Sequence, residues 1–257
     1  KAPSMEIIAG TSLIADIITD LTDASVSTYT LLPSAACPSQ FDMKAGDIGR
    51  LQQAGLIFLH PWQVQLANIR RVLEAAKIPK DHVCIVEVPG NWMVPDVQIE
   101  AVKTLASLLT TLYPAEQASI QQRVETRINE INAITKKAKE LINTAEGVPI
   151  LCNEMQAPFL KWTGFNVVET YTGPEDWSVA ETERLVHLGR EHKIMLVVDN
   201  LQSGGLRMSE TLARDIGTVN VVLSNFPNGL PDTPTWQSAF MENINRLNKA
   251  IEAIRAR

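Results

Sequence analysis

The sequence has few of the residues that hold metals and disulfides. It contains four histidines and three cysteines in 257 residues. The odd cysteine count excludes complete internal disulfide pairing, and Cys37, Cys84 and Cys152 match no CxxC zinc or redox spacing. Cys84 lies in an apolar run and is expected to be a buried small side chain. A disulfide scaffold and a zinc-finger type of site are therefore excluded.

Positive charge and catalytic signatures are also missing. The net charge is −6, and no stripe of Lys and Arg gathers on one segment, which argues against a nucleic-acid partner. No apolar run is long enough to cross a bilayer. Gly204-Gly205 forms neither a GxGxxG nor a P-loop, and no GxSxG elbow is present. These absences argue against an enzyme.

The sequence does contain a regular alternation of apolar runs and amphipathic segments. Strands are predicted at 5–10, 26–32, 56–59, 82–88, 149–152, 165–170, 194–198 and 219–223. Helices are predicted at 12–22, 44–54, 64–76, 95–112, 157–162, 178–192, 209–216 and 233–256. This order predicts an α/β fold with parallel sheets and right-handed βαβ connections.

One long segment, 114–148, interrupts the alternation. Its apolar residues recur every three or four positions, which is one stripe on a helix. We therefore predict two Rossmann-like lobes with parallel sheets, joined by one long rigid backbone helix. The predicted divisions are an N-terminal lobe over 1–113, a linking helix over 114–148 and a C-terminal lobe over 149–257.

Six loops follow the predicted strands. In open parallel sheets ligands bind beyond the carboxyl ends of the strands. If the lobes face each other, these loops meet in one cleft. The loops are 33–40, 60–62, 89–93, 152–156, 199–205 and 224–229.

The loops and the long helix together resemble the zinc/manganese-type substrate-binding proteins of bacterial ABC importers. IIAGTSLIADI (7–17) is similar to the opening strand and helix of that family. LLPSAACPSQFD (31–42) is similar to the loop written LLPPGADPHTFE, and the following segment 47–58 also matches. GPEDWS (173–178) resembles a region of the second lobe.

The resemblance implies extracytoplasmic capture of a solute, with a lipid anchor as an option, and delivery to a membrane permease. It implies limited bending between the lobes. The family holds its metal with three histidines and one carboxylate, and these positions fall here on Ser39, Gly90, Asn153 and Ser224. Neutral groups do not replace imidazole and carboxylate for a tightly held dication. The usual metal site is therefore not carried over.

Two kinds of cargo remain open. A transition metal bound by non-standard ligands would use soft donors, which favour Cu(I) or Zn(II). The candidate donors are Cys37, His60, Met93, Cys152, Glu154 and Met155. A metal chelate or a small organic solute would instead use neutral hydrogen-bonding groups and indole faces. The candidates for that mode are Ser39, Gln40, His60, Trp62, Asn91, Trp92, Asn153, Glu154, Gln156, Asn200, Gln202, Ser224 and Asn225.

The sequence therefore predicts a periplasmic or extracytoplasmic solute-binding component of a metal-type ABC importer. The alternative is a member whose site serves metal handover or sensing. No cofactor is predicted, because the metal ion or chelate enters only as transported cargo. The expected partners are the permease and the solute, and the chain is expected to be a monomer.

Overall fold

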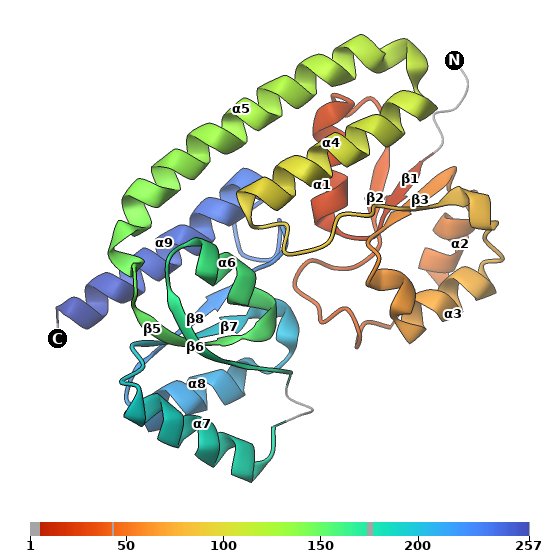
Figure 1. Cartoon of the computed structure of the whole chain (residues 1–257). Coiled ribbons are helices and arrows are strands. Elements are labelled where there is room, and N and C mark those ends of the chain that lie inside the picture. Colours follow the sequence, from red (N-terminus) through yellow and green to blue (C-terminus); the bar gives the residue numbers. More distant parts are fainter. Residues whose placement is uncertain (1–5, 43, 174–176, 257) are drawn as a thin grey trace.

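The structure is a computed structural model that describes residues 6–42, 44–173 and 177–256. Two four-stranded parallel sheets form the centres of two lobes (Figure 1). The strand order is β2-β1-β3-β4 in the N-terminal lobe and β6-β5-β7-β8 in the C-terminal lobe. The predicted α/β fold with two parallel sheets is confirmed. Met5, the first residue of a predicted strand, and residues 174–176, part of the family-like segment 173–178, lie outside the described residues.

The N-terminal lobe alternates strands and helices as predicted. Its elements are β1 (Ile7–Ala9), α1 (Ser12–Leu21), β2 (Thr28–Thr30), α2 (Ala45–Gln53), β3 (Leu56–Leu59), the 3-10 turn η1 (Gln63–Gln65), α3 (Ala67–Ala75), the 3-10 turn η2 (Lys80–His82), β4 (Val83–Ile85) and α4 (Pro95–Leu112). Strand β3 has the predicted bounds, whereas β1, β2 and β4 are shorter than predicted, because each of these three strands pairs with its neighbours over only three residues. The flanking apolar residues of the predicted strands continue as loop.

The C-terminal lobe repeats the pattern. Its elements are β5 (Pro149–Asn153), the 3-10 turn η5 (Glu154–Gln156), α6 (Ala157–Trp162), β6 (Asn166–Tyr171), α7 (Val179–Glu191), β7 (Leu196–Asn200), the 3-10 turn η7 (Leu201–Ser203), α8 (Leu206–Ile216), β8 (Val219–Leu223) and α9 (Trp236–Arg255). Helix α8 begins three residues earlier than predicted, with Gly205 as its N-cap, and Gly204, whose φ is +75°, closes the preceding turn.

The long helix joins the two lobes along one side of the molecule (Figure 1). Helix α5 (Gln117–Ile142) has 26 residues, about 39 Å at about 1.5 Å per residue. The 3-10 turns η3 (Pro114–Glu116) and η4 (Asn143–Ala145) flank it. The predicted rod is confirmed, but it ends before 148. Gly147, with φ of +72°, turns the chain into β5. None of the described helices is both long and apolar enough to span a membrane.

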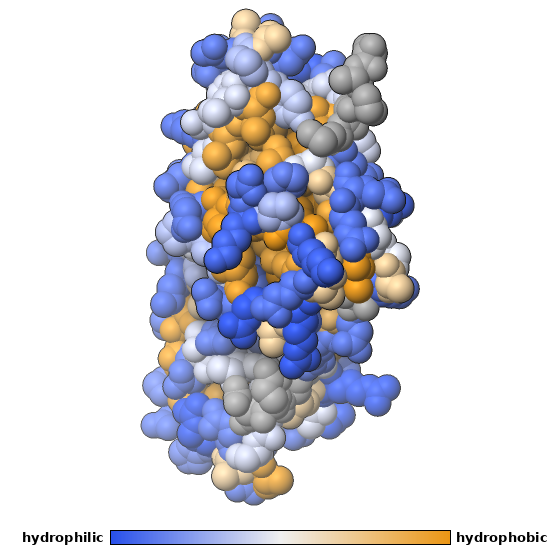
Figure 2. Space-filling view, turned by 90° about the vertical axis from the view of Figure 1, so that its right-hand side faces the viewer, coloured by the Kyte–Doolittle hydropathy of each residue, from blue (hydrophilic) through white to orange (hydrophobic). Residues whose placement is uncertain are grey.

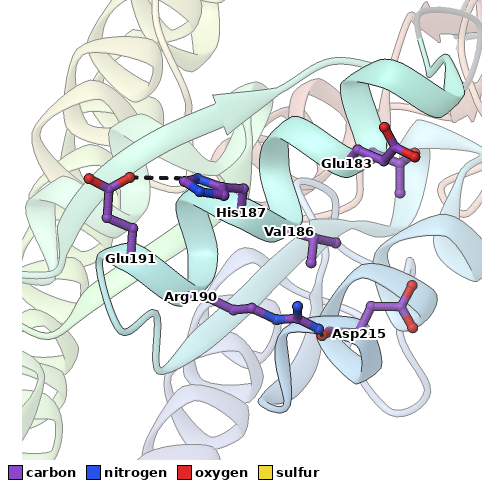
Figure 3. Close-up of a pocket in the computed structure, with 7 residues that line it drawn as sticks. Glu183, Val186, His187, Arg190, Glu191 and Asp215 are labelled. Carbon is purple, nitrogen blue, oxygen red and sulfur yellow. Dashed lines mark hydrogen bonds and ion pairs between the residues drawn. The ribbon is translucent and has the colours of Figure 1, made fainter.

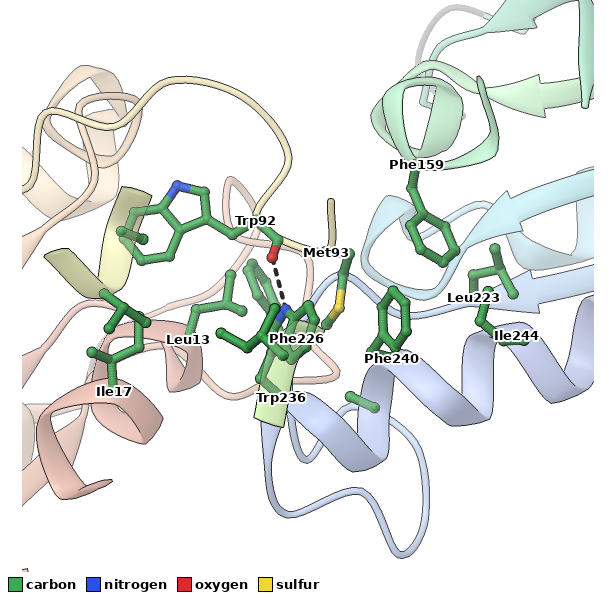
Figure 4. Close-up of a cluster of buried hydrophobic side chains, with 14 of the residues drawn as sticks. Leu13, Ile17, Trp92, Met93, Phe159, Leu223, Phe226, Trp236, Phe240 and Ile244 are labelled. Atoms are coloured by element: carbon green, nitrogen blue, oxygen red, sulfur yellow. Dashed lines mark hydrogen bonds between the residues drawn. The ribbon is translucent and has the colours of Figure 1, made fainter. Parts of the chain in front are cut away.

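One apolar core runs through both lobes and the long helix. Trp236 and Phe240 of α9 stack on each other and meet Met93 after β4, Leu13 of α1 and Phe159 of α6 in this cluster (Figure 4). The Trp236 indole Nε1 donates to the Trp92 carbonyl at 2.7 Å. Full burial of side chains of this size contributes about 2–3 kcal/mol each. The two lobes therefore share one continuous hydrophobic core.

Separate smaller clusters fill the outer layers of each lobe. In the N-terminal lobe, Leu51 of α2 and Ile69 and Val72 of α3 cover Ile57 of β3. This side faces the viewer in Figure 2, where apolar surface in the upper half is interrupted by hydrophilic side chains. In the C-terminal lobe, Leu185 of α7 and Leu212 of α8 cover the second sheet. The carboxyl ends of the strands are left for the loops between the lobes.

Candidate functional site

Loops from the two lobes meet where the strands end. The Asn91 amide, after β4, donates to the Met155 carbonyl at 2.8 Å and to Asn225 Oδ1 at 2.9 Å. The Gln202 amide donates to the Ser34 carbonyl at 2.7 Å, and the Ser12 hydroxyl donates to the Pro227 carbonyl at 2.7 Å. All four bonds cross between the lobes. We refer to these residues, with the partners described next, as the inter-lobe junction.

A set of buried amides continues the junction inside the C-terminal lobe. Gln156 Nε2 lies 3.1 Å from both Asn200 Oδ1 and Asn225 Oδ1, and donates to them. Asn200 and Gln156 are almost completely buried. The other amide atom, Gln156 Oε1, is buried and has no partner among the described residues. An unpaired buried acceptor of this kind is a ready contact for a donor on a bound molecule.

Ser224, in the loop after β8, makes several hydrogen bonds within the C-terminal side of the junction. Its hydroxyl accepts from Gln202 Nε2 at 2.9 Å and donates to the Phe226 carbonyl at 2.9 Å. Its backbone N–H donates to Asn243 Oδ1 of α9, which returns a bond to the Ser224 carbonyl. Gly229 lies so close that a Cβ there would be 2.1 Å from the Ser224 oxygen. This loop conformation therefore needs a residue without a side chain.

The junction has no ionised side chain of its own. Asn, Gln and Ser stay neutral over the physiological pH range, so the junction does not depend on protonation. Asp199 directly precedes Asn200 in sequence, but it points to the other face of β7. Burial raises the pKa of the Asp199 carboxyl, while the Asn200 N–H and the Ser203 hydroxyl donate to its Oδ1. What the junction offers is amide and hydroxyl hydrogen bonding.

His60 is buried away from this network. Its Nε2 lies 2.8 Å from the Thr11 hydroxyl, and its ring stacks on Trp62 and meets Trp92 edge-on. Burial lowers the pKa of His60 to about 3, so the imidazole is neutral. Trp92 is buried, with its Nε1 donating to the Val88 carbonyl, whereas 39% of Trp62 is exposed. Of the two predicted indoles, Trp62 can meet a solute.

The structure does not bring the predicted metal donors together. Met93 and Cys152 are fully buried in the apolar core, and burial raises the pKa of the Cys152 thiol to about 12. Met155 is exposed on the other lobe from Cys37. No three His, Cys, Asp or Glu side chains in the described ranges gather closely enough to hold a metal ion. The metal-ligand assignment therefore stays a prediction without support from this geometry.

The remaining predicted residues lie around the junction. Asn153 is buried, and its Oδ1 accepts from the Met155 N–H at 3.0 Å. Ser39 and Glu154 are exposed, and the Cys37 sulfur lies 3.3 Å from the Ser39 hydroxyl. Gln40 reaches the other lobe, because a Cβ at Gly204 would lie 3.5 Å from its Oε1. All thirteen predicted ligand residues stay predictions, and three of them, Asn91, Gln202 and Asn225, make cross-lobe hydrogen bonds.

Sequence reasoning missed several participants. Ser12 and Asn243 belong to the junction, and so does Gly229, which the sequence placed in the loop 224–229 without naming it as a site residue. Gln63 donates to the Gly10 carbonyl and fixes the turn after β1. The loop after β1 was left out of the six predicted loops, although it ends a strand like the others. The rule that ligands bind beyond the carboxyl ends of parallel strands also applies to this loop, and would have included Ser12.

A hollow of about 600 Å³ lies elsewhere, on α7 and α8 (Figure 3). His187 and Glu191 lie 3.7 Å apart on its wall, and Arg190 donates to the Asp215 carbonyl. His187 is 82% exposed. None of the residues that line this surface groove belongs to the junction. We assign it no role.

Comparison with known proteins agrees with the fold. The curated metal ABC transporter substrate-binding lipoprotein ScbA of Streptococcus cristatus is 20% identical over 220 residues, which cover 77% of this chain and 68% of ScbA. The structure of a cadmium-bound periplasmic metal-binding protein from Candidatus Liberibacter asiaticus superposes with a TM-score of 0.79 at 15% identity, covering 96% of this chain and 99% of that one.

A crystal structure of ZnuA superposes with a TM-score of 0.78 at 15% identity, again over 96% of this chain and 99% of the other. At such identities these structures show a common fold. The sequence itself matches the family described as ZnuA, zinc-uptake complex component A, periplasmic, over residues 7–250. The chain therefore belongs to the ZnuA family, the periplasmic substrate-binding components of metal ABC importers.

Proposed function

We propose that this chain captures its cargo at the inter-lobe junction through neutral hydrogen-bonding groups. The cargo would then be a metal chelate or a small polar organic solute rather than a bare dication. The observation that supports this most directly is the cross-lobe amide pair of Asn91 and Asn225. Amide groups present both donors and acceptors, which matches an organic molecule better than a naked cation.

The positions of the soft donors support the same proposal. His60 is engaged by Thr11, and the Cys152 thiol is held protonated inside the core. A metal ion needs deprotonated, converging ligands at about 2.0–2.3 Å. Moving Met93 or Cys152 to a common site would require the shared core to open. Binding of a bare ion by these residues therefore has a high structural cost.

The wider role follows from the family. We infer that the loaded chain docks on a membrane permease on the extracytoplasmic side, held there by a lipid anchor. We infer that it acts as a monomer with lobes 1–113 and 149–257 on either side of the linking segment 114–148. We further infer that it does no chemistry on the cargo, since its junction offers no nucleophile activated by a base.

Native mass spectrometry of the purified protein tests the proposal by showing what co-purifies. Calorimetry with Zn²⁺, Mn²⁺ and Cu(I) on metal-free protein is the second arm. We expect no stoichiometric sub-micromolar binding of any bare ion, and a co-purifying organic mass. Tight one-to-one ion binding that is abolished by Cys37→Ala or His60→Ala would overturn the proposal. The exposed His187→Ala serves as the control.

A further inference from the structure

Three side-chain amides at the carboxyl ends of β5, β7 and β8 form a connected cluster within the junction. Gln156 Nε2 donates to Asn200 Oδ1 and to Asn225 Oδ1, each at 3.1 Å. We call Gln156, Asn200 and Asn225 the amide cluster. Gln156 and Asn200 are almost completely buried. The cluster lies at the edge of the sheet where parallel sheets bind ligands.

The orientation of every amide in the cluster follows from a backbone group outside it. A backbone N–H can only donate, so Asn91 Oδ1 accepts from the Met93 N–H at 2.8 Å. The Asn91 nitrogen then donates across the lobes to Asn225, which must present Oδ1. Gln156 meets this same oxygen, so it presents Nε2. Asn200 must in turn present Oδ1 to that nitrogen.

This series of bonds leaves two donors and one acceptor of the cluster unpaired. Both Oδ1 atoms are taken, whereas the Nδ2 groups of Asn200 and Asn225 donate no hydrogen bond within the described ranges. Gln156 Oε1 is buried and has no partner there either. An unpaired buried polar group is unfavourable, so a molecule that pairs with these atoms is bound more tightly.

The neighbouring polar side chains of the junction are already engaged. Gln202 Nε2 donates to the Ser34 carbonyl and to the Ser224 hydroxyl, and Gln202 Oε1 accepts from the Asn225 N–H. The Ser224 hydroxyl in turn donates to the Phe226 carbonyl. These side chains shape the junction. The amide cluster, in contrast, has unpaired groups for a cargo.

The unpaired groups favour a particular chemistry. The hydrogen-bond partners of the cluster are neutral, so a buried carboxylate would have no cation beside it, which is costly. Each hydroxyl of a polyol brings a proton that needs an acceptor, and the cluster has only one acceptor to spare. A carbonyl oxygen brings no proton. Two carbonyl oxygens and one N–H therefore match the cluster best.

We propose that the amide cluster recognises a neutral amide that carries a second carbonyl group. This inference rests on the proposed function and names the class of cargo. The two carbonyl oxygens accept from Asn200 and Asn225, and the N–H donates to Gln156 Oε1. Because Gln156 Oε1 is buried, the cargo reaches it when the Asn91 side chain turns away from Asn225.

The test compares three probes on the wild-type full-length protein. N-acetylglycinamide is neutral and has two carbonyl oxygens and N–H donors. N-acetylglycinate keeps its skeleton but ends in a carboxylate, and erythritol is neutral but has only hydroxyls. The readout is the side-chain amide signals of isotope-labelled protein in proton–nitrogen correlation NMR. We expect saturable shifts of the Asn200 and Asn225 signals with N-acetylglycinamide, and binding of the other two that is weaker by about tenfold or more.

Two variants locate the binding in the cluster. Asn200→Asp and Asn225→Asp each replace an unpaired N–H group by an oxygen and keep the Oδ1 that accepts from Gln156. Each variant also assigns the amide signal that it removes. We expect each to weaken the binding of N-acetylglycinamide by about tenfold or more. Asn166→Asp makes the same change at an exposed residue where β6 begins, at the opposite edge of the sheet, and should bind like the wild type.

Absence of saturable binding of N-acetylglycinamide overturns the cargo assignment, and so does equal or tighter binding of either other probe. Unchanged affinity in Asn200→Asp or Asn225→Asp overturns it as well, with circular dichroism confirming that each variant is folded. The probe comparison needs the wild type only, so it decides the class even if a variant does not fold.

These failures are distinguishable from failure of the proposed function. That function stands if native mass spectrometry still shows an organic mass and calorimetry shows no tight ion binding. Tight binding of bare Zn²⁺ overturns both together.

Discussion

At the scale of single residues, two positions depend on neutral contacts. His60 shows this most clearly, since the Thr11 hydroxyl is the only hydrogen-bond partner of its imidazole ring among the described residues. A buried imidazole without a carboxylate beside it stays uncharged. Gly229 shows the complementary case, in which the absence of a side chain lets the Ser224 and Gln202 side chains approach. Both residues lead to direct tests.

The burial of His60 predicts a pH-dependent stability. Its pKa is lowered to about 3 in the folded chain, against about 6.5 when unfolded. Between these values the unfolded chain binds a proton that the folded chain does not, so stability falls as the pH falls from about 6.5 toward 3. The slope is about 1.4 kcal/mol per pH unit. We expect His60→Gln to remove this slope in urea titrations, relative to the wild type.

His187→Gln is the control for this experiment, because His187 is 82% exposed. It should keep the pH dependence of the wild type. A His60→Gln variant that loses stability between pH 6 and 4 as steeply as the wild type would contradict the buried, neutral assignment.

Gly229→Ala should disturb the junction without touching the core. The added Cβ would lie 2.1 Å from the Ser224 hydroxyl and 3.1 Å from Gln202 Nε2, so both side chains must move. We expect a loss of about 1–3 kcal/mol, typical of overpacking. Chemical unfolding measures it. Gly46→Ala, where nothing lies within 4 Å of the added atom, should instead be neutral or stabilising because Gly46 is in α2.

At the scale of elements, the long helix is fixed by a buried charge as well as by its apolar stripe. Arg127 of α5 is 2% exposed and pairs with Asp16 at 2.5 Å and with Asp20 at 2.9 Å, both on α1. Asp16 also accepts from the backbone N–H of Trp236, at the start of α9. Three helices therefore meet at one carboxylate. Removing the cation would leave that carboxylate buried and unpaired.

Arg127→Ala should destabilise the chain by about 3–5 kcal/mol, the usual cost of breaking one side of a buried ion pair. Arg123→Ala on the same helix is the matched control. Its partner Asp23 is 76% exposed, so the loss there should be about 0–1 kcal/mol. Thermal and urea unfolding of both variants provide the comparison. Equal losses would show that the Arg127 pair does not anchor the helix.

At the scale of the whole molecule, the lobes are joined by a shared core, a stiff helix and a junction of neutral side chains. The cross-lobe hydrogen bonds of the junction are made by neutral side chains and backbone carbonyls. The closed arrangement should therefore persist over pH 5–8 and without added ions. Loop segments 33–36, 89–91 and 224–229 report directly on it.

Hydrogen–deuterium exchange tests this whole-molecule prediction. We expect the three segments to be protected to the same extent in metal-free protein and with added Zn²⁺. The double variant Asn91→Ala/Gln202→Ala, which removes two cross-lobe donors, should exchange faster at these segments. Protection that arises only after Zn²⁺ is added would show that a metal closes the lobes.

The sequence alone determined the order of the elements, the two parallel sheets and the connecting helix. Periods of two and of 3.6 residues are local properties, and helices α4 and α6 begin and end where their patterns predicted. It also showed that the strand-end loops are rich in Asn, Gln and Ser, because residue types can be read one position at a time.

Only the tertiary structure decided what those neutral groups do. Asn91 and Asn225 are 134 positions apart, and Arg127 lies 111 positions from Asp16, so no local pattern links either pair. Burial likewise depends on distant neighbours, which is why Cys152, Met93 and His60 could not be separated from ligand candidates by sequence. Pairing and desolvation are set by residues that the fold brings together from distant parts of the sequence.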